Sequence, residues 1–113
     1  MKDQRLYLGH ILESITAIEN YTVGCNKQEF LQQPEKQDAV IRRLEVIGEA
    51  ARHLSDGLFK ATAQIEWRAV KAMRNFLIHE YFRVDLNLVW KVVKKDLPQM
   101  KKILSVLETE KYT

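Results

Sequence analysis

Apolar residues recur along most of the chain at steps of three and four, the spacing that places them on one side of an α-helix. Four segments carry this pattern: about residues 3–21, 34–54, 66–79 and the stretch from 86 onward. The apolar positions of the four stripes are Leu8, Ile11, Leu12, Ile15 and Ile18; Val40, Leu44, Ile47, Ala51 and Leu54; Trp67, Val70, Met73 and Leu77; and Val89, Val92, Val93, Met100, Ile103, Leu104 and Leu107.

The connections between these segments carry turn and cap residues. Between the first two helices, we expect Phe30 and Leu31 to pack as a lid or a short turn. Ser55-Asp56-Gly57 is expected to end the second helix with C-cap and turn chemistry, and residues 58–65 are ambiguous. Asp85 can cap a fourth helix that begins at Leu86.

Pro98 lies inside the fourth apolar stripe. It is expected either to kink one long helix or to divide it after Asp96, because proline lacks the N–H that a helix interior needs. With no strand pattern visible, the sequence predicts an all-α fold. We expect one domain over residues 1–113, an up-and-down four-helix bundle with an additional short or kinked C-terminal helix.

Composition is that of a soluble globular protein, 46% hydrophobic and 29% charged. No apolar run approaches the ~20 residues that a transmembrane helix needs, and no N-terminal signal is visible, so no membrane association is expected. The single Cys25 cannot form an internal disulfide, which makes the cytoplasm the default location. We expect Cys25 to fill space in a loop and assign it no catalytic role.

Charge is distributed unevenly along the chain. Residues 1–59 hold 7 Lys or Arg against 9 Asp or Glu, whereas residues 60–113 hold 11 against 6. Most of the basic excess comes from Lys91, Lys94, Lys95, Lys101 and Lys102. This distribution is mild support for an anionic partner, although a solvated helix face would look the same.

The stretch MRNFLIHEY, residues 73–81, sets polar side chains inside an apolar helix. A histidine has an unperturbed pKa of about 6.5 and can act as a general base or acid. An arginine supplies fixed charge and paired donors for phosphate oxygens. An asparagine can hold either group in place. Arg74, Asn75 and His79 therefore suit metal-independent cleavage of a phosphodiester, with no cofactor required.

Spacing complicates this hypothesis. Arg74 and His79 are five apart and lie about 140° from each other on an ideal helix, so one chain would not easily aim both at one atom. A helix end that unwinds near His79, or a two-fold partner that supplies a second copy, would solve this. Purely structural roles remain open: Arg74 paired with a carboxylate, Asn75 bonded to backbone, and His79 capping the helix.

Residues 74–81 resemble the Arg-Asn-x-x-x-His-x-Tyr signature of HepT toxins, a branch of the HEPN ribonucleases. The resemblance extends over about residues 3–108 and includes the segments 43–51, 67–73, 81–85, Val89-Trp90 and 96–98. It implies an all-α bundle, HEPN-like, that works as a homodimer with the Arg and His of both protomers facing one cleft. The implied activity is endoribonuclease cleavage of RNA.

The same resemblance implies roles for single residues. Arg74 would stabilise the phosphate, His79 would be the general acid and base, and Asn75 would position them. The family is the toxin component of a type VII-like toxin–antitoxin system, whose antitoxin is a minimal nucleotidyltransferase. That enzyme would transfer AMP from ATP onto Tyr81 and so block the cleft; assembly into a larger hetero-oligomer with the antitoxin is left open.

Two other functions compete with this one. The chain could be a non-catalytic helical binding or regulatory subunit of a nucleotidyltransferase complex. It could instead hold a metal in the bundle, with His10, Glu45, Glu49 and His53 as candidates, although no Glu-x-x-His pair of the di-iron type is present. Glu49 and His53 are four apart and can simply contact each other. Trp67, Trp90, Phe76 and Phe82 are expected to be core or dimer contacts.

Overall fold

The computed structural model describes the backbone of residues 4–79 and 84–111, and the side chains of residues 4–73 and 84–107. All regular structure in these ranges is helical, which confirms the predicted all-α class. None of the described helices combines the length and the apolar character needed to cross a bilayer.

The four predicted segments are present as long helical elements. They are α1 (Gln4–Thr22), α3 (Pro34–Ala51), α5 (Trp67–His79) and a continuous rod made of α6 (Leu86–Lys91), the π-helical turn η2 (Val92–Asp96) and α7 (Leu97–Lys111). Two short helices join them, α2 (Lys27–Leu31) and α4 (Asp56–Ala61).

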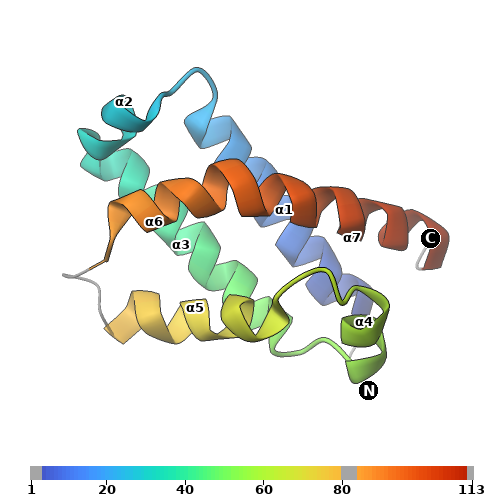
Figure 1. The fold of residues 1–113 in the computed structure, drawn as a ribbon. Helices are drawn as coiled ribbons and strands as arrows, with labels where there is room; N and C mark the ends of the chain where they lie inside the picture. Colours follow the sequence, from blue (N-terminus) through green and yellow to red (C-terminus); the bar gives the residue numbers. More distant parts are fainter. Residues whose placement is uncertain (1–3, 80–83, 112–113) are drawn as a thin grey trace.

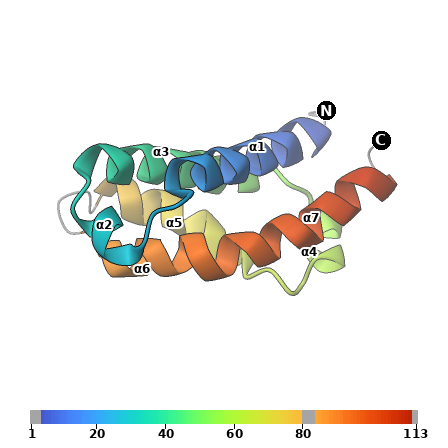
Figure 2. The ribbon, with the colours of Figure 1, turned by 90° about the horizontal axis from the view of Figure 1, so that it is seen from above.

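The helices form two levels, with α1 and α3 side by side in one and the rod in the other (Figures 1 and 2). Helix α3 packs against both α1 and α5, and α7 packs across α1. The end of α5 and the beginning of α6 lie at the same end of the molecule, and the rod runs from there toward the opposite end, where α4 lies (Figure 1). This arrangement places the helix with the Arg-Asn-His residues beside the rod with the lysines.

The core lies where these helices meet, and the predicted stripes supply it. Leu8, Ile11, Ile15 and Ile18 of α1 are all fully buried, as the three-and-four spacing predicts. Buried residues of the other helices complete one cluster: Phe30, Val40, Ile41, Leu44, Ile47, Ala50, Ala51, Leu54, Leu58, Ile65, Trp67, Val89, Val93, Leu97, Met100 and Leu104.

Helix α2 is a short capped helix that closes one end of the core. Asn26 accepts from the N–H of Glu29, whose carboxylate accepts from the N–H of Asn26, which makes a complete capping box. Phe30 is fully buried and its ring centroid lies 5.1 Å from that of Trp90. The expected lid or short turn at Phe30 and Leu31 is therefore a helical turn, with Phe30 inside and Leu31 exposed.

The predicted role of Ser55-Asp56-Gly57 was wrong. Helix α3 ends at Ala51, before Leu54, and Ser55 accepts from the N–H of Leu58 to cap the start of α4. Serine and aspartate favour helix N-termini as well as turns, so the same letters are compatible with a helix start. The ambiguous stretch 58–65 contains the rest of α4 and the connection to α5.

The rod changes from π-helical to α-helical spacing after Asp96, where a division was one of the two outcomes predicted for Pro98, but its backbone stays helical there. The N–H of Leu97 donates to the carbonyl of Val92, five residues back, which is the π-helical spacing. Pro98 has no N–H to donate to the carbonyl of Lys94, so a wider turn absorbs the missing bond without breaking the helical path. The chain thus remains helical through the point where the sequence allowed a kink.

Candidate active site

Helix α5 carries three of the four predicted site residues. Arg74, Asn75 and His79 lie on one continuous helix from Trp67 to His79. Their side chains are outside the part of the chain that the structure describes, and so is the whole of Tyr81. On this helix Arg74 and His79 remain about 140° apart around the axis and about 7.5 Å apart along it. The backbone alone does not bring both to one atom.

The first turn of α5 is anchored by polar contacts inside the core. The indole N–H of Trp67, a residue only 6% exposed, donates to the hydroxyl of Thr62 at 2.9 Å. Thr62 in turn donates to the carbonyl of Leu58 at 2.7 Å. Phe59 lies against Trp67 with 5.3 Å between ring centroids, and the ammonium of Lys71 stands 4.6 Å from the Phe59 centroid. Helix α4 therefore fixes where α5 begins.

An apolar groove runs between α5 and the rod. It consists of two adjoining hollows of about 360 and 380 Å³ that share Ala69, Met73, Val92 and Asp96. The side chains of Ala69 and Ala72 are exposed along α5, and Leu88 is 46% exposed on α6. We call this hollowed surface the α5 groove; it lies next to the helix with the predicted catalytic residues.

The rod begins beside the end of α5 and is fixed by a cap and an aromatic contact. The carboxylate of Asp85 accepts from the N–H groups of Asn87 and Leu88 at 3.0 and 3.3 Å, which confirms the predicted cap of α6. Trp90 is half-buried between Phe30 on one side and the ammonium of Lys94 on the other.

The expected core role of Trp67 and Trp90 is thus confirmed. Trp67 is buried and Trp90 packs against the core cluster. Phe76 and Phe82 lie outside the described side chains.

The four candidate metal ligands do meet, at a hollow between α1 and α3. His10, Glu45, Glu49 and His53 all line a space of about 350 Å³, together with Tyr7 and Arg42. His53 Nε2 lies 3.6 Å from Glu49 Oε1, the contact expected of this pair, and Tyr7 stacks on the His53 ring at 4.5 Å. Among the described residues no three His, Cys, Asp or Glu side chains are placed to bind one ion. The hollow therefore gives no support to the metal hypothesis.

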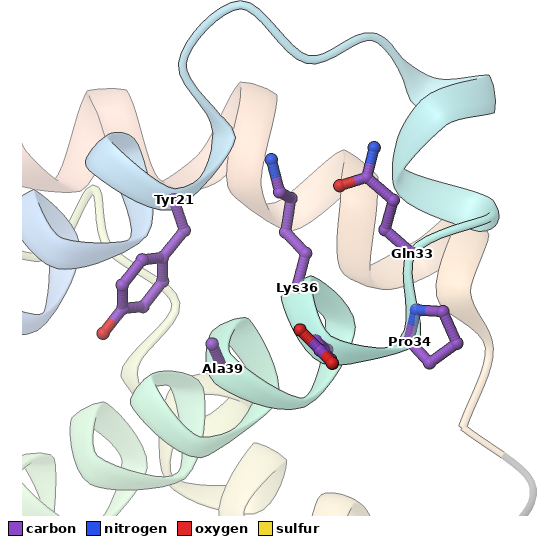
Figure 3. Close-up of a pocket in the computed structure, with 6 residues that line it drawn as sticks. Tyr21, Gln33, Pro34, Lys36 and Ala39 are labelled. Atoms are coloured by element: carbon purple, nitrogen blue, oxygen red, sulfur yellow. The ribbon is translucent and has the colours of Figure 1, made fainter.

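Another hollow, of about 660 Å³, lies where the end of α1 faces the start of α3. Tyr21 of α1 and Lys36 of α3 both reach into the gap between the two helices, and Gln33 stands above the first turn of α3 (Figure 3). No sequence motif predicts this hollow, because it forms where Tyr21 of one helix meets residues 33–39 at the start of another. None of them belongs to the signature on α5.

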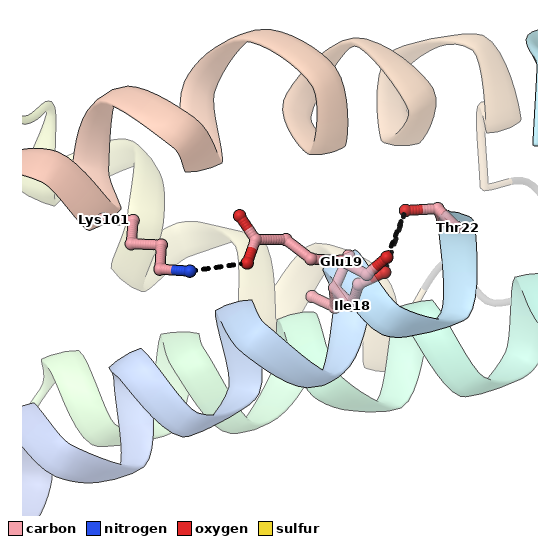
Figure 4. A network of polar contacts seen from close by, with 4 residues as sticks. All are labelled: Ile18, Glu19, Thr22 and Lys101. Carbon is pink, nitrogen blue, oxygen red and sulfur yellow. Dashed lines mark hydrogen bonds and ion pairs between the residues drawn. The ribbon is translucent and has the colours of Figure 1, made fainter. Parts of the chain in front are cut away.

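Among the side chains that the structure describes, one ion pair joins the rod to α1. Lys101 Nζ lies 2.7 Å from Glu19 Oε1, and on the same turn of α1 the hydroxyl of Thr22 donates to the carbonyl of Ile18 at 2.9 Å (Figure 4). Both charged side chains are more than a third exposed, so the pair contributes little to stability. Lys101 thus forms an ion pair within the fold, whereas Lys94 of the rod contacts the ring of Trp90.

A family model described as "Ribonuclease HepT-like" matches residues 11–107, a range that contains the entire stretch from Arg74 to Tyr81. The chain belongs to the HepT-like ribonuclease family. The resemblance predicted from the signature is therefore confirmed. In this family member the signature lies on α5 of the helical fold described above.

Three relatives show how far the likeness extends. A "Gamma-glutamylcyclotransferase and putative RNase" of Methanocaldococcus jannaschii is 47% identical over 108 residues, 95% of this chain and 49% of that protein. A "Probable ribonuclease HepT" of Thermococcus cleftensis is 42% identical over 95 residues, 84% of this chain and 86% of that protein. A "Putative RNase" of Caldanaerobacter subterraneus subsp. tengcongensis is 33% identical over 112 residues, 98% of this chain and 100% of that protein.

The chain thus spans about half the length of the first of these relatives and the whole length of the third. No solved structure matches the chain.

Proposed function

We propose that this HepT-like chain is a metal-independent endoribonuclease that acts in the cytoplasm as the toxin of a type VII-like toxin–antitoxin pair. One observation carries the proposal: Arg74, Asn75 and His79 occur at the signature spacing on one helix, α5, in a member of the HepT-like ribonuclease family. The relatives from Thermococcus and Caldanaerobacter carry ribonuclease names, which points the same way.

The proposed reaction is an internal transesterification of RNA. A histidine removes the proton from the 2′-hydroxyl, whose oxygen then attacks the adjacent phosphorus. The P–O5′ bond breaks, and the departing 5′-oxygen takes a proton from an acid. The products are a 2′,3′-cyclic phosphate and a 5′-hydroxyl. Arg74 stabilises the charge on the non-bridging oxygens during the attack, and Asn75 holds the reacting groups in position.

The reaction calls for a base and an acid on opposite sides of one phosphate, and a homodimer supplies both. Two copies of α5 related by a two-fold axis bring two His79 and two Arg74 to one cleft, which removes the problem of the 140° separation on a single helix. The α5 groove supports this arrangement, because it leaves Ala69, Ala72 and Leu88 exposed beside the signature. An apolar face next to a half-complete site favours a second copy of the chain as its cover.

The proposed off-switch is AMP on Tyr81, transferred from ATP by a minimal nucleotidyltransferase antitoxin. Tyr81 follows His79 by two residues, so a nucleotide attached there adds negative charge and bulk next to the general base. RNA phosphates would be repelled from the same place. This step rests on the resemblance of residues 74–81 to the HepT signature.

The test uses chain whose intact mass shows an unmodified Tyr81, incubated with labelled RNA in excess chelator. Wild type is expected to cut the RNA and leave 2′,3′-cyclic phosphate ends, whereas His79→Ala is expected to lose at least a hundredfold in rate. His10→Ala is the matched control, since His10 is an exposed histidine on α1 away from the signature, and it should cut like wild type.

Two outcomes contradict the proposal. If wild type cuts no RNA offered, the chain acts as a non-catalytic binding or regulatory subunit, and His79→Ala should then alter complex formation with the nucleotidyltransferase. If His79→Ala cuts as fast as wild type, or if chelator stops cleavage, the assigned residues do not carry the reaction.

A further inference from the structure

The solvent side of the rod carries four lysines in a row. Lys91 ends α6, Lys94 and Lys95 lie in the π turn, and Lys102 lies in α7; all four are exposed. Because Val93, Leu97 and Leu104 of the same rod are buried, the four lysines lie on the side of the rod that faces solvent. We call these four residues the lysine row.

The other sides of the rod are already occupied. Val93, Leu97 and Leu104 face the core, whereas Val92 and Asp96 line the α5 groove. None of the four lysines is buried or lines the α5 groove, and the row borders that groove because Lys91 and Lys95 lie three residues after Leu88 and Val92. The row is separate from Lys101, which binds Glu19 of α1.

The lysine row lacks the ion pairs of an ordinary solvated helix face, and the nearest carboxylate in the sequence is that of Asp96 beside Lys95. Along α3 and its C-cap residue, by contrast, Arg42–Glu45 and Arg52–Glu49 approach to 3.6 and 3.7 Å at three-residue spacing. No carboxylate stands three or four residues from any member of the lysine row, and none of the four forms an ion pair with the residues described.

Like charges at such spacing destabilise a helix by a few tenths of a kcal/mol per pair. The row concentrates positive charge at that cost, which favours a role in binding a polyanion.

The position of the lysine row indicates which polyanion it binds. The rod starts where α5 ends, runs back alongside α5 and continues beyond its start (Figure 1), so the row leads away from the end of α5 that carries the signature. At 1.5 Å per residue, Lys91 and Lys102 are about 16 Å apart along the rod. Proteins hold single strands on positively charged surfaces that follow the backbone, and a strand that follows a row of this length meets it at more than one phosphate.

We propose that the lysine row binds the phosphate backbone of single-stranded RNA beyond the cleaved bond, without reading its bases. The inference rests on the proposed ribonuclease function. It states where the RNA chain runs after it leaves the cleft. It predicts that long RNA is bound and cut better than RNA too short to reach the row. The lysines act by holding substrate and take no part in the bond-breaking step.

The test compares two fourfold variants of equal net charge. In the first, Lys91, Lys94, Lys95 and Lys102 are each changed to Gln. The control variant changes four basic residues elsewhere on the surface to Gln: Lys27, Lys36, Arg52 and Lys60. A third variant replaces the lysine row with Arg, which keeps the charge. Circular dichroism and thermal unfolding establish that each variant is folded before any assay.

Binding is measured on a His79→Ala background with a labelled 20-nucleotide single strand over a range of salt concentrations. Loss of the lysine row should weaken binding at least tenfold at low salt. It should also reduce the slope of log K against log salt by about 0.7 for each lysine that contacts a phosphate. The Arg variant and the control variant should bind like wild type.

Cleavage is measured in the catalytically intact chain on the same strand and on a dinucleoside monophosphate, which cannot span from the cleft to the row. The row variant should lose kcat/KM on the long strand and keep wild-type kcat/KM on the dinucleotide. Equal losses in the row and control variants, or an unchanged salt slope in the row variant, would overturn the proposed RNA path. Failure of wild type to cut either substrate would instead overturn the ribonuclease function. The binding assay would still show whether the lysine row binds RNA.

Discussion

The indole N–H of Trp67, the first residue of α5, donates to the hydroxyl of Thr62, the residue that follows α4, at 2.9 Å. The same hydroxyl donates onward to the carbonyl of Leu58 at 2.7 Å, and all three residues are buried. The start of the helix with the predicted catalytic residues is thus fixed by directed bonds as well as by its apolar stripe. Directed bonds restrict rotation of α5 about its axis, which apolar packing alone tolerates.

Replacing Thr62 with Val tests the contribution of these two hydrogen bonds. Valine matches threonine in shape but leaves the buried indole N–H of Trp67 without an acceptor, so we expect a loss of about 1–3 kcal/mol in the free energy of unfolding. Thr62→Ser keeps the hydroxyl and should lose less. Urea unfolding of the three chains gives the comparison, and a Val variant at least as stable as the Ser variant would show that the hydrogen bond does not stabilise the fold.

Replacing Ser14 should raise the free energy of unfolding, the opposite of the effect expected at Thr62. Its side chain is fully buried in α1, and its hydroxyl has no hydrogen-bond partner among the described residues. Ser14→Ala removes a buried polar group and improves helix propensity, so we expect stability to rise by up to about 1 kcal/mol. Thr16→Ala, at an exposed position of the same helix, measures the propensity effect alone. A lower urea midpoint for Ser14→Ala would mean that the hydroxyl is satisfied in solution.

Asp85 is expected to contribute through its cap. It accepts from two N–H groups at the start of α6, so Asp85→Ala should cost about 1 kcal/mol, as loss of an N-cap commonly does. Asp85→Asn retains an acceptor oxygen and should keep most of that stability. Asp96→Ala is the control, an exposed aspartate in the same rod at the end of η2. Equal midpoints for Asp85→Ala and Asp96→Ala in thermal unfolding would contradict a stabilising cap.

Helix stripes and the cap at Asp85 could be predicted from the sequence because each depends on residues a few positions apart. The start of α4 could not, since Ser55-Asp56-Gly57 suits a helix start and a turn equally well. The π turn before Pro98 could not be predicted either, because a missing N–H is equally compatible with a kink or a division, and packing of Val93 and Leu97 into the core favours the continuous path. The local sequence is compatible with more than one backbone structure at these positions, and tertiary contacts determine which one forms.

Part of the candidate site could likewise be predicted from the sequence, and part could not. Arg74, Asn75 and His79 could be found because their spacing on one helix is a local pattern, and the family match then gave the pattern a meaning. The α5 groove could not be predicted, because it joins Ala69 and Ala72 to Leu88 and Val92 across two helices. The hollow lined by Tyr21 and Lys36 was missed for the same reason.

Tyr81→Phe separates the proposed off-switch from the proposed reaction. The phenolic oxygen takes no part in the transesterification, so Tyr81→Phe should cut RNA within a few-fold of wild type. It also lacks the hydroxyl that would accept AMP. With ATP and a minimal nucleotidyltransferase of the proposed antitoxin class, wild type should gain the mass of AMP and stop cutting, whereas Tyr81→Phe should gain none and continue.

Tyr21→Phe is the matched control for that experiment, because Tyr21 is a partly buried tyrosine at the end of α1. It should be modified and silenced like wild type. AMP found on Tyr81→Phe would place the acceptor at another residue. Full cleavage by modified wild type would show that the nucleotide does not reach the cleft, since negative charge and bulk beside His79 should exclude the RNA phosphate.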